Sequence, residues 1–400
     1  MTTIAKIDAV VVNVGYQAPI QWSGGSNASW TRTVVQVTTD DGLVGIGETQ
    51  GGASVKALID NELAALFLGE DPFAVKRMLA KTLFIPYYHG KLGCGAVAAL
   101  ELACWDLMGK SVARPLCELL GGRFRDEVPF SAYVFHRARN ADGGGEVDTT
   151  DQVVARAREL VDEYGFTTIK YKGGVRGERA EVANMWALRE VFPEHKLRFD
   201  PNAIYSVPTA IRMGKEFERV GLEYYEDPVW GNPAMARVRD RVDIPLATNM
   251  CVTDLDSLAV GYGLRSVDVV LGDIFEWGGV TNITKLHAFC DATQLGVNFH
   301  SAAEGGIGQA AYLHMAAVCP ALPFALDTTA AEFVDDVVVD GSIEFTGRGT
   351  ALVPRGPGLG VSIDDGKLEA AHAAYLRDGD IPAYQEDSSR GGTIPFTSMY

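Results

Sequence analysis

The chain has 400 residues, of which 47% are hydrophobic and 22% are charged, a balance typical of a globular protein. This length exceeds one ordinary core, so it predicts two domains or a barrel with an additional domain. The formal net charge of −17, from 35 Lys and Arg against 52 Asp and Glu, disfavours nucleic acid and anionic membrane surfaces as partners.

The first fifty residues show strand patterns. Residues 4–14 and 32–39 are rich in β-branched residues in rough alternation, and Asp40-Asp41-Gly42 supplies a turn into residues 44–48. These runs predict an antiparallel meander. Residues 16–30, between the first two strands, are rich in Gly and Ser and contain two tryptophans, which fits either a mobile lid or an ordinary surface connection.

Helical patterns follow the meander, at residues 54–67, 71–83 and 95–110. The last of them is rich in small residues, which predicts tight helix packing. Strands and helices together predict an α+β capping domain over residues 1–127.

From residue 128 onward, short apolar runs alternate with helical patterns. The predicted strands are residues 131–135, 168–172, 197–200, 223–226, 246–249, 267–272, 297–300 and 324–327. The predicted helices are residues 152–164, 178–191, 208–220, 233–242, 255–263, 280–292 and 307–318. Eight strands alternating with helices favour a barrel over an open sheet. Because the last strand lacks a clear helix after it, we predict an α/β fold with a modified TIM barrel of the (β/α)7β type over residues 128–330.

The remaining segment, residues 331–400, is predicted to complete the capping domain. A short strand at 361–364 leads to a helix at 367–376 that packs back on the N-terminal domain. Residues 386–400 are polar and contain Gly and Ser, so we expect a partly disordered tail.

The cysteines and the N-terminus bear on the cellular compartment. The six cysteines have no CxxC or other ligand spacing and lie in mostly apolar surroundings, which predicts buried free thiols. Residues 1–12 have no basic region followed by a long apolar run, and no window approaches about 18 apolar residues. These features predict a cytoplasmic protein with no membrane partner.

Polar residues end the predicted barrel strands at regular intervals. They are Lys170 and Lys172, Asp200, Glu226, Asn249, Asp273, His300 and Asp327, and from Lys172 onward they lie 23 to 28 residues apart. One strand and one helix occupy about that length, so these side chains should converge at one mouth of the barrel. Each has an ordinary alternative as a helix cap, a turn residue or a core histidine. Because all of these residues fall at the same position relative to their strands, an active site is the favoured interpretation.

Two chemistries follow from these residue types. Asp200, Glu226 and Asn249 offer three oxygen ligands from consecutive strands, which suits Mg²⁺. Lys172 and His300, the latter with Asp273 as its orienting partner, are two possible bases on different strands, able to reach opposite faces of a bound α-carbon.

Lys170 and Lys172 are spaced two apart and so share one face of their strand. A neighbouring cation lowers the pKa of a lysine, which makes it a better base. A solvated edge strand with two surface lysines is the ordinary alternative.

These residues resemble the enolase superfamily, most closely the glucarate dehydratase-like members of its mandelate racemase subgroup. The specific motifs are Ile169-Lys170-Tyr171-Lys172-Gly173-Gly174, Phe199-Asp200-Pro201-Asn202, Tyr225-Glu226-Asp227-Pro228 and Leu246-Ala247-Thr248-Asn249-Met250. The resemblance extends from Thr31-Arg32 and Gly45-Ile46-Gly47-Glu48 to Gly358-Leu359-Gly360-Val361.

The resemblance implies a hydro-lyase. Asp200, Glu226 and Asn249 would bind Mg²⁺, Lys172 would be one acid/base, and His300 with Asp273 would be the other. The reaction would abstract the proton α to a carboxylate, with His300 as the general acid for the step that follows. Lys170 would depress the pKa of Lys172 and help to stabilise the enolate. Loss of the β-hydroxyl would give a 2-keto-3-deoxy acid sugar.

The residues expected to bind substrate are Tyr133, Phe135, Asn202, Ser301 and Asp327. A small acid sugar and a homo-oligomeric assembly are the expected partners.

Two departures from the glucarate pattern concern specificity. Ser301-Ala302-Ala303-Glu304 follows the histidine where Ser-Asn-Asn is expected, and no histidine occurs near Ser26. We expect Glu304 to place a charge near the distal end of the substrate, which disfavours a diacid and favours an aldonate. A racemase or epimerase using the same two bases, and a binding protein with a decayed site, are the alternative functions.

Overall fold

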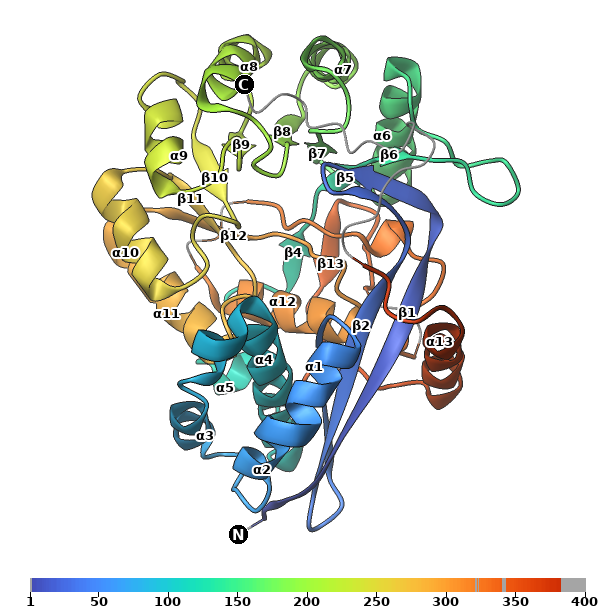
Figure 1. Cartoon of the computed structure of the whole chain (residues 1–400), viewed down its shortest axis with the longest axis vertical. Coiled ribbons are helices and arrows are strands. Elements are labelled where there is room, and N and C mark those ends of the chain that lie inside the picture. Colours follow the sequence, from blue (N-terminus) through green and yellow to red (C-terminus); the bar gives the residue numbers. More distant parts are fainter. Residues whose placement is uncertain (1, 321, 323, 340–342, 383–400) are drawn as a thin grey trace.

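The computed structural model describes residues 2–320, 322, 324–339 and 343–382. A long antiparallel hairpin, β1 (Ile4–Trp22) and β2 (Gly25–Thr39), runs along one side of the molecule, and β3 (Val44–Gln50) pairs with β2 (Figure 1). The predicted meander is therefore confirmed.

The prediction of a loop at residues 16–30 is wrong. Both strands continue through this stretch, and only Ser23-Gly24 at the tip forms the turn. The physical reason is tertiary pairing, because β6 (His136–Arg137) adds to β1 through Ile20 and Gln21 and binds the hairpin end to the barrel. The Gly and Ser content of residues 16–30 does not predict such a pairing.

The helices of the N-terminal region are α1 (Ala53–Leu58), a π-helical turn (Ile59–Leu63), α2 (Ala64–Phe67), α3 (Val75–Lys81), α4 (Ile85–Ser111) and α5 (Leu116–Leu119). They confirm the three predicted helical regions, although α4 starts ten residues earlier than predicted and is kinked at Gly90, with φ 59°. Helix α4 lies close against β3, where a Cβ on Gly45 or Gly47 would collide with carbonyl oxygens of α4. The tight packing predicted for its small residues follows from this contact.

Helix α4 also has the length and mean hydropathy, 1.4 over its most apolar window, of a membrane-crossing helix. The expectation that no window approaches this apolarity therefore needs correction. Because 83% of that window is buried inside the fold, the apolar residues serve as core of the protein.

The barrel consists of short parallel strands with helices outside them (Figure 1). Among the described residues, its named strands are β5 (Ala132–Val134), β7 (Thr168–Lys172), β8 (Lys196–Asp200), β9 (Tyr224–Glu226), β10 (Leu246–Thr248), β11 (Val269–Gly272) and β12 (Gly296–Phe299). The helices are α6 (Thr150–Tyr164), α7 (Glu178–Val191), α8 (Val207–Val220), α9 (Asn232–Arg239), α10 (Leu255–Leu264), α11 (Val280–Thr293) and α12 (Gly306–Val318). These elements match the predicted alternation.

The eighth predicted strand, residues 324–327, is an extended segment without a ladder. Leu326 forms a single parallel bridge to Phe130, and the Asp327 amide donates to the Phe299 carbonyl at 3.3 Å. The segment therefore lies between the first and last strands of the sheet and links them. With this link, the fold is the predicted modified barrel.

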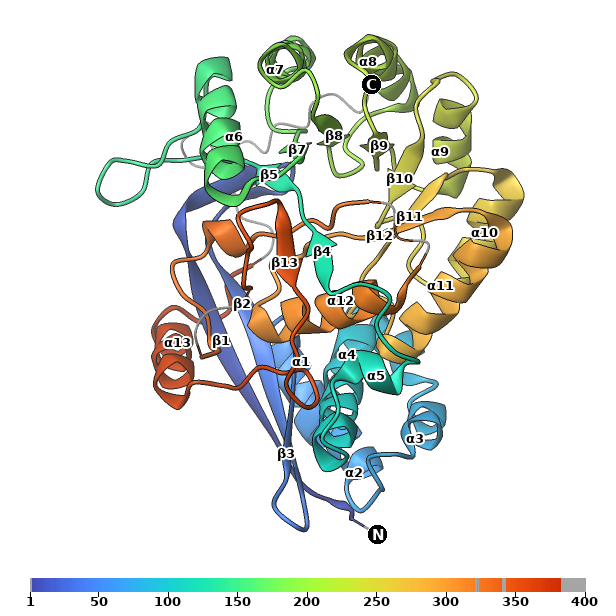
Figure 2. The same ribbon diagram turned by 180° about the vertical axis from the view of Figure 1, so that it is seen from behind.

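The C-terminal segment returns to the N-terminal domain, as predicted. Helix α13 (Asp365–Asp378) packs against β1, where the His372 Nδ1 atom lies 2.7 Å from the Val11 carbonyl oxygen (Figure 2). Residues 361–364 form no strand, since only one bridge joins Val338 and Ile363. A further short pair is β4 (Glu127–Pro129) with β13 (Thr350–Leu352). The predicted tail at 386–400 lies outside the described residues, and the domain boundaries at 127 and 330 remain predictions.

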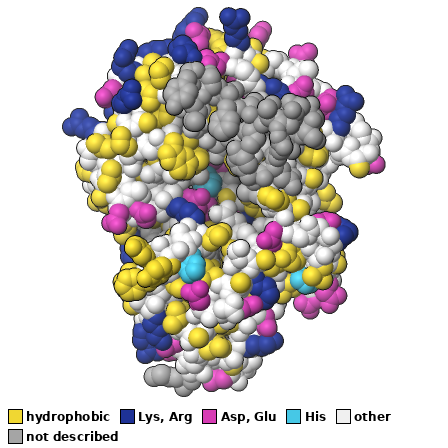
Figure 3. All heavy atoms as spheres, viewed as in Figure 1, with side chains coloured by type: hydrophobic (Ala, Val, Ile, Leu, Met, Phe, Trp, Pro, Cys, Tyr) yellow, Lys and Arg dark blue, Asp and Glu magenta, His cyan; other side chains and the backbone are white. Residues whose placement is uncertain are grey.

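All six cysteines are free thiols, five of them buried, which agrees with their predicted state. One face of the molecule shows acidic and basic side chains interspersed (Figure 3). The cytoplasmic location and the homo-oligomeric state remain predictions.

Candidate active site

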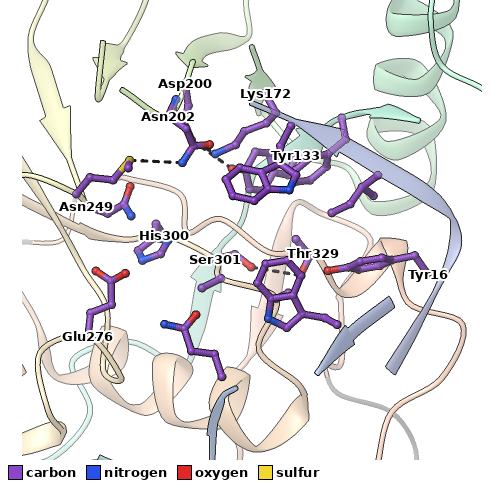
Figure 4. Close-up of a pocket in the computed structure, with 18 residues that line it drawn as sticks. Tyr16, Tyr133, Lys172, Asp200, Asn202, Asn249, Glu276, His300, Ser301 and Thr329 are labelled. Carbon is purple, nitrogen blue, oxygen red and sulfur yellow. Dashed lines mark hydrogen bonds and ion pairs between the residues drawn. The ribbon is translucent and has the colours of Figure 1, made fainter. Parts of the chain in front are cut away.

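A cavity of about 250 Å³ lies at the carboxyl ends of the barrel strands, beside the end of the β1–β2 hairpin (Figure 4). The barrel contributes Tyr133, Phe135, Lys172, Asp200, Asn202, Asn249, Met250, Glu276, His300, Ser301, Ala302, Ala303 and Thr329. The first three strands and their loops contribute Tyr16, Ile20, Trp22, Trp30 and Gln50. This is the mouth at which the strand-end residues were expected to converge.

Strand β7 presents both of its lysines to the inside of the barrel. The Lys172 Nζ atom lies 2.5 Å from Asp200 Oδ2, in agreement with the register that pairs these two residues. Lys170 is fully buried behind it, 2.7 Å from Asp327 Oδ2 and within 2.7 Å of both carboxylate oxygens of Glu226. The alternative of a solvated edge strand does not describe this strand, which is buried along its length.

The carboxylates around Lys170 determine its charge. Burial alone would lower the pKa of Lys170, but Asp327 and Glu226 outweigh it and hold the pKa well above the ordinary value. Lys170 is therefore a fixed cation inside the barrel. The same two lysines keep the pKa of Asp200 below its ordinary value, against the effect of burial.

Tyr133 covers both ammonium groups. Its ring centroid lies 4.6 Å from Lys170 Nζ and 5.7 Å from Lys172 Nζ, and its hydroxyl donates to Asp200 Oδ2 at 3.3 Å. Phe135 packs on the Tyr133 ring with the centroids 4.3 Å apart. Contact between a cation and an aromatic face is favourable, so this pair of rings helps to fix the lysines in place.

His300 and Asp273 form the second pair of titratable groups. The Asp273 Oδ2 atom lies 2.8 Å from His300 Nε2, while Asp273 Oδ1 accepts the backbone amides of Phe275 and Glu276. Burial would lower the pKa of His300, but contact with Asp273 outweighs it and raises the pKa to about 9. His300 is therefore protonated at neutral pH and able to act as an acid.

Asn249 owes its position to Asp227. The Asp227 Oδ2 atom accepts the backbone amides of Asn249 at 2.9 Å and Met250 at 3.2 Å, and its other oxygen accepts the Thr248 hydroxyl. Burial raises the pKa of Asp227 to about 6. Asp227 therefore holds the loop that carries Asn249.

The donor set at the ends of β8, β9 and β10 fits a hard divalent cation. Asp200, Glu226 and Asn249 offer only oxygen ligands, two anionic and one neutral, and the first and last of them line the cavity. Glu226 lies just behind, 1% exposed.

A second group of possible ligands lies nearby, where ligand atoms of Asp273, Glu276 and His300 fall within 4.8 Å of one another. The His300 Nε2 atom already pairs with Asp273 Oδ2 at 2.8 Å, and Mg²⁺ prefers oxygen ligands, so the oxygen set is the better candidate.

Most of the predicted site residues do come together. Lys172, Asp200, Asn249, His300, Tyr133, Phe135, Asn202 and Ser301 line the cavity, and Lys170, Glu226 and Asp273 form the layer behind it. Asp327 does not line the cavity as predicted. It is fully buried, and it accepts hydrogen bonds from Lys170 and from the Ser131 hydroxyl at 2.8 Å.

The expectation for Glu304 is also wrong. Its side chain is fully buried and does not line the cavity, since its oxygens accept from the Ala302 amide and the Gln309 side chain. Positive φ at Ala303, 60°, turns the chain there. The argument from Glu304 against a diacid therefore has no structural basis.

Several cavity residues were missed in the sequence. They are Tyr16, Ile20, Gln50, Met250, Glu276 and Thr329. Tyr16 and Ile20 fall in the stretch predicted as a loop, and Glu276 and Thr329 lie beyond the predicted strand ends. Glu276 follows Asp273 by three residues, which is the only sequence signal that it carried.

Comparison with known proteins agrees with this geometry. The family described as mandelate racemase/muconate lactonizing enzyme, N-terminal domain, matches residues 6–121, and the family described as enolase C-terminal domain-like matches residues 152–367. The chain belongs to the enolase superfamily, in its mandelate racemase subgroup. This family membership confirms the predicted resemblance.

Two curated relatives of this superfamily member are named dehydratases. A probable glucarate dehydratase of Streptomyces coelicolor is 37% identical, covering 90% of this chain and 88% of its own. The arabinonate dehydratase of Saccharolobus solfataricus is 28% identical, covering 84% and 88%. A solved enolase of Pseudomonas fluorescens, with bound magnesium, potassium and tartrate, is 33% identical with a TM-score of 0.88, covering 94% of both chains.

Proposed function

We propose that this superfamily member is a Mg²⁺-dependent acid sugar dehydratase, which removes water from a 2,3-dihydroxy acid and releases a 2-keto-3-deoxy acid. The observation that carries the proposal is the pair of acid/base groups, Lys172 on β7 and His300 after β12, that line one cavity with Asp200 and Asn249. The two named dehydratases support the same reaction class.

Asp200, Glu226 and Asn249 would hold the cation. When bound, Mg²⁺ supplies a Lewis acid for the substrate carboxylate and for the negative charge that develops on it. Lys170, a fixed cation surrounded by carboxylates, adds to the positive potential at the same position. The site thus favours a substrate that gains negative charge during the reaction.

The proton transfers divide between two residues. Lys172, acting as its neutral amine, takes the proton from the α-carbon, and the electron pair left there forms the new double bond as the β-hydroxyl departs. His300, protonated beside Asp273, gives its proton to the departing hydroxyl, which leaves as water. The enol product then tautomerises to the 2-keto acid. One substrate gives one keto acid and one water, with no oxidant required.

A racemase or epimerase is the second candidate, because the two acid/base groups come from different strands and face one cavity. In that reaction His300 would return a proton to the opposite face of the α-carbon without loss of the hydroxyl. The two candidates give different products, a 2-keto acid or an isomer of the substrate.

The test is a screen of purified protein with Mg²⁺ against a panel of aldonates and aldarates, with detection of 2-keto acid. We expect keto acid from at least one compound and complete loss of activity with EDTA, restored by added Mg²⁺. Activity that EDTA leaves intact would contradict the metal assignment. Isomerised substrate without keto acid would favour the epimerase.

A further inference from the structure

We propose that the substrate carries a single carboxylate, and that the hairpin side of the cavity binds its uncharged, hydroxyl-bearing end. This inference rests on the proposed dehydratase function and deepens it by naming the substrate class. Four observations carry it: the distribution of charge around the cavity, the engagement of the nearby cations, an unpartnered hydroxyl, and the position of Glu276.

Charge is confined to one side of the cavity. Among the described residues that line it, the cationic side chains are Lys172 and His300 and the anionic ones are Asp200 and Glu276. All four belong to the barrel. The rest of the wall is uncharged and comprises, on its hairpin side, Tyr16, Ile20, Trp22, Trp30 and Gln50, with Ser301 and Thr329 next to them. In Figure 4, Ser301, Thr329 and Tyr16 lie across His300 from Asn249.

The cations near this uncharged side are engaged elsewhere. Arg32 is 1% exposed, its Nη2 atom lies 3.4 Å from Glu48 Oε1, and its Nη1 atom donates to the Ala302 carbonyl at 3.3 Å. Its Nε and Nη2 atoms form no hydrogen bond among the described residues. Arg176 donates to Gln21 Oε1 at 3.1 Å and pairs with Asp148.

Neither arginine lines the cavity. Within the described part of the chain, a second carboxylate on the hairpin side would lie in the cavity without a cationic lining residue as its partner, which is unfavourable.

The same side offers neutral hydrogen-bonding groups. The Tyr16 hydroxyl is buried and has no hydrogen-bond partner among the described residues, while its ring is held by stacking on Phe333 at 5.3 Å. Burial raises the pKa of Tyr16 well above its ordinary value, so it remains a neutral donor and acceptor.

The Ser301 and Thr329 hydroxyls lie 3.3 Å apart at the same wall. Buried polar groups normally have partners, and a substrate hydroxyl would supply one for Tyr16.

The two tryptophans complete an apolar surface. The Trp22 indole nitrogen already donates to Asn27 Oδ1 at 2.9 Å, so this residue offers its ring to the cavity. Aromatic faces bound by a few neutral polar groups suit the carbon skeleton of a sugar chain better than a second carboxylate.

Glu276 adds an obstacle to a diacid. Its carboxyl lines the cavity next to His300, and burial together with the charge of Asp273 raises its pKa to about 7. The ionised form of Glu276 repels a second carboxylate in the cavity while accepting hydrogen bonds from hydroxyls.

The test compares aldonates and aldarates matched in chain length and configuration, gluconate with glucarate and galactonate with galactarate, using the full chain with Mg²⁺. We expect kcat/KM for the preferred aldonate to exceed that of its matched aldarate by about 100-fold or more, the size of an unpaired buried charge.

An aldarate that equals or exceeds its aldonate would overturn the inference while the proposed dehydratase stands. Turnover of neither class would overturn the proposed function, and the inference with it.

A variant tests the hairpin contact separately. Tyr16→Phe removes the unpartnered hydroxyl, so we expect KM for the aldonate to rise about tenfold with kcat and the melting temperature nearly unchanged. The matched control is Tyr312→Phe, which removes another buried, unpartnered hydroxyl that does not line the cavity and should leave KM unchanged. Equal KM values for Tyr16→Phe and wild type would contradict the contact.

Discussion

The two sides of the cavity differ in the chemical character of their side chains. On the barrel side, Lys170, Lys172, Asp200 and Glu226 lie in a dense set of ion pairs at the ends of neighbouring strands. On the hairpin side, aromatic rings and neutral hydroxyls face the same space. The first arrangement suits proton transfer and charge stabilisation, and the second suits recognition of a polyhydroxy chain. Changes on the barrel side should therefore affect kcat, and changes on the hairpin side should affect KM and substrate choice.

The largest effect is expected for Lys172→Ala. Loss of the proton acceptor should lower kcat on the order of 10³-fold, within the range for a general base. Steady-state kinetics with the best acid sugar measures it. Lys196→Ala is the matched control, because that lysine lies on the neighbouring β8 with its side chain 56% exposed and pairs only with Glu223 among the described residues. If both variants lose activity equally, the role assigned to Lys172 is wrong.

The next effect concerns pH. Since the pKa of His300 is raised to about 9, its acid form is present at lower pH and is lost as pH rises through about 9. The kcat/KM profile should fall on this alkaline limb, and the stability that His300 gains from Asp273 should fade over the same interval, from about 6.5 upward.

Asp273→Asn should move the limb toward about 6.5. A limb that stays in place in this variant would show that Asp273 does not set the titration.

A smaller effect on function and a clear effect on stability are expected for Asp327→Ala. This carboxylate is buried among Lys170, Arg198 and Ser131, so its removal leaves two buried cations short of a partner. We expect a loss of about 3 kcal/mol in the free energy of unfolding, measured by denaturant titration, with KM unchanged. An increase in KM without loss of stability would instead show that Asp327 contributes to substrate binding.

The smallest effect is expected for Glu276→Gln. Removing the charge that repels a second carboxylate should raise aldarate kcat/KM a few-fold relative to the aldonate. Asp291→Asn, on α11, is a suitable control because it lies outside the cavity. If the ratio of aldarate to aldonate kcat/KM is the same as in wild type, Glu276 does not contribute to specificity.

The same division explains how much the sequence predicted. Strand ends recur with the period of one strand and one helix, so spacing alone predicts that Lys172, Asp200, Asn249 and His300 converge, and they line one cavity. The hairpin side depends on β6 pairing with β1, a contact between residues more than one hundred positions apart in the chain. No local pattern in residues 16–30 reports it, and the Gly and Ser content there pointed to a loop.

Side-chain direction was the other limit. Asp327 ends the eighth predicted strand at the expected spacing from His300. Its carboxylate nevertheless lies among buried cations behind the cavity. Glu304 follows His300 by four residues, yet positive φ at Ala303 accompanies a turn of the chain at this point, and the Glu304 side chain is buried. Position along the chain predicted the neighbourhood of both residues, while hydrogen bonds formed only in the folded state decide where they point.

The central claim is that Lys172 removes the α-proton and His300 only assists departure of the hydroxyl. The most direct measurement follows α-proton exchange of substrate in deuterated water, with Mg²⁺, by NMR. We predict that His300→Asn exchanges the α-proton without forming keto acid, while Lys172→Ala does neither. Exchange retained in Lys172→Ala and lost in His300→Asn would contradict the account.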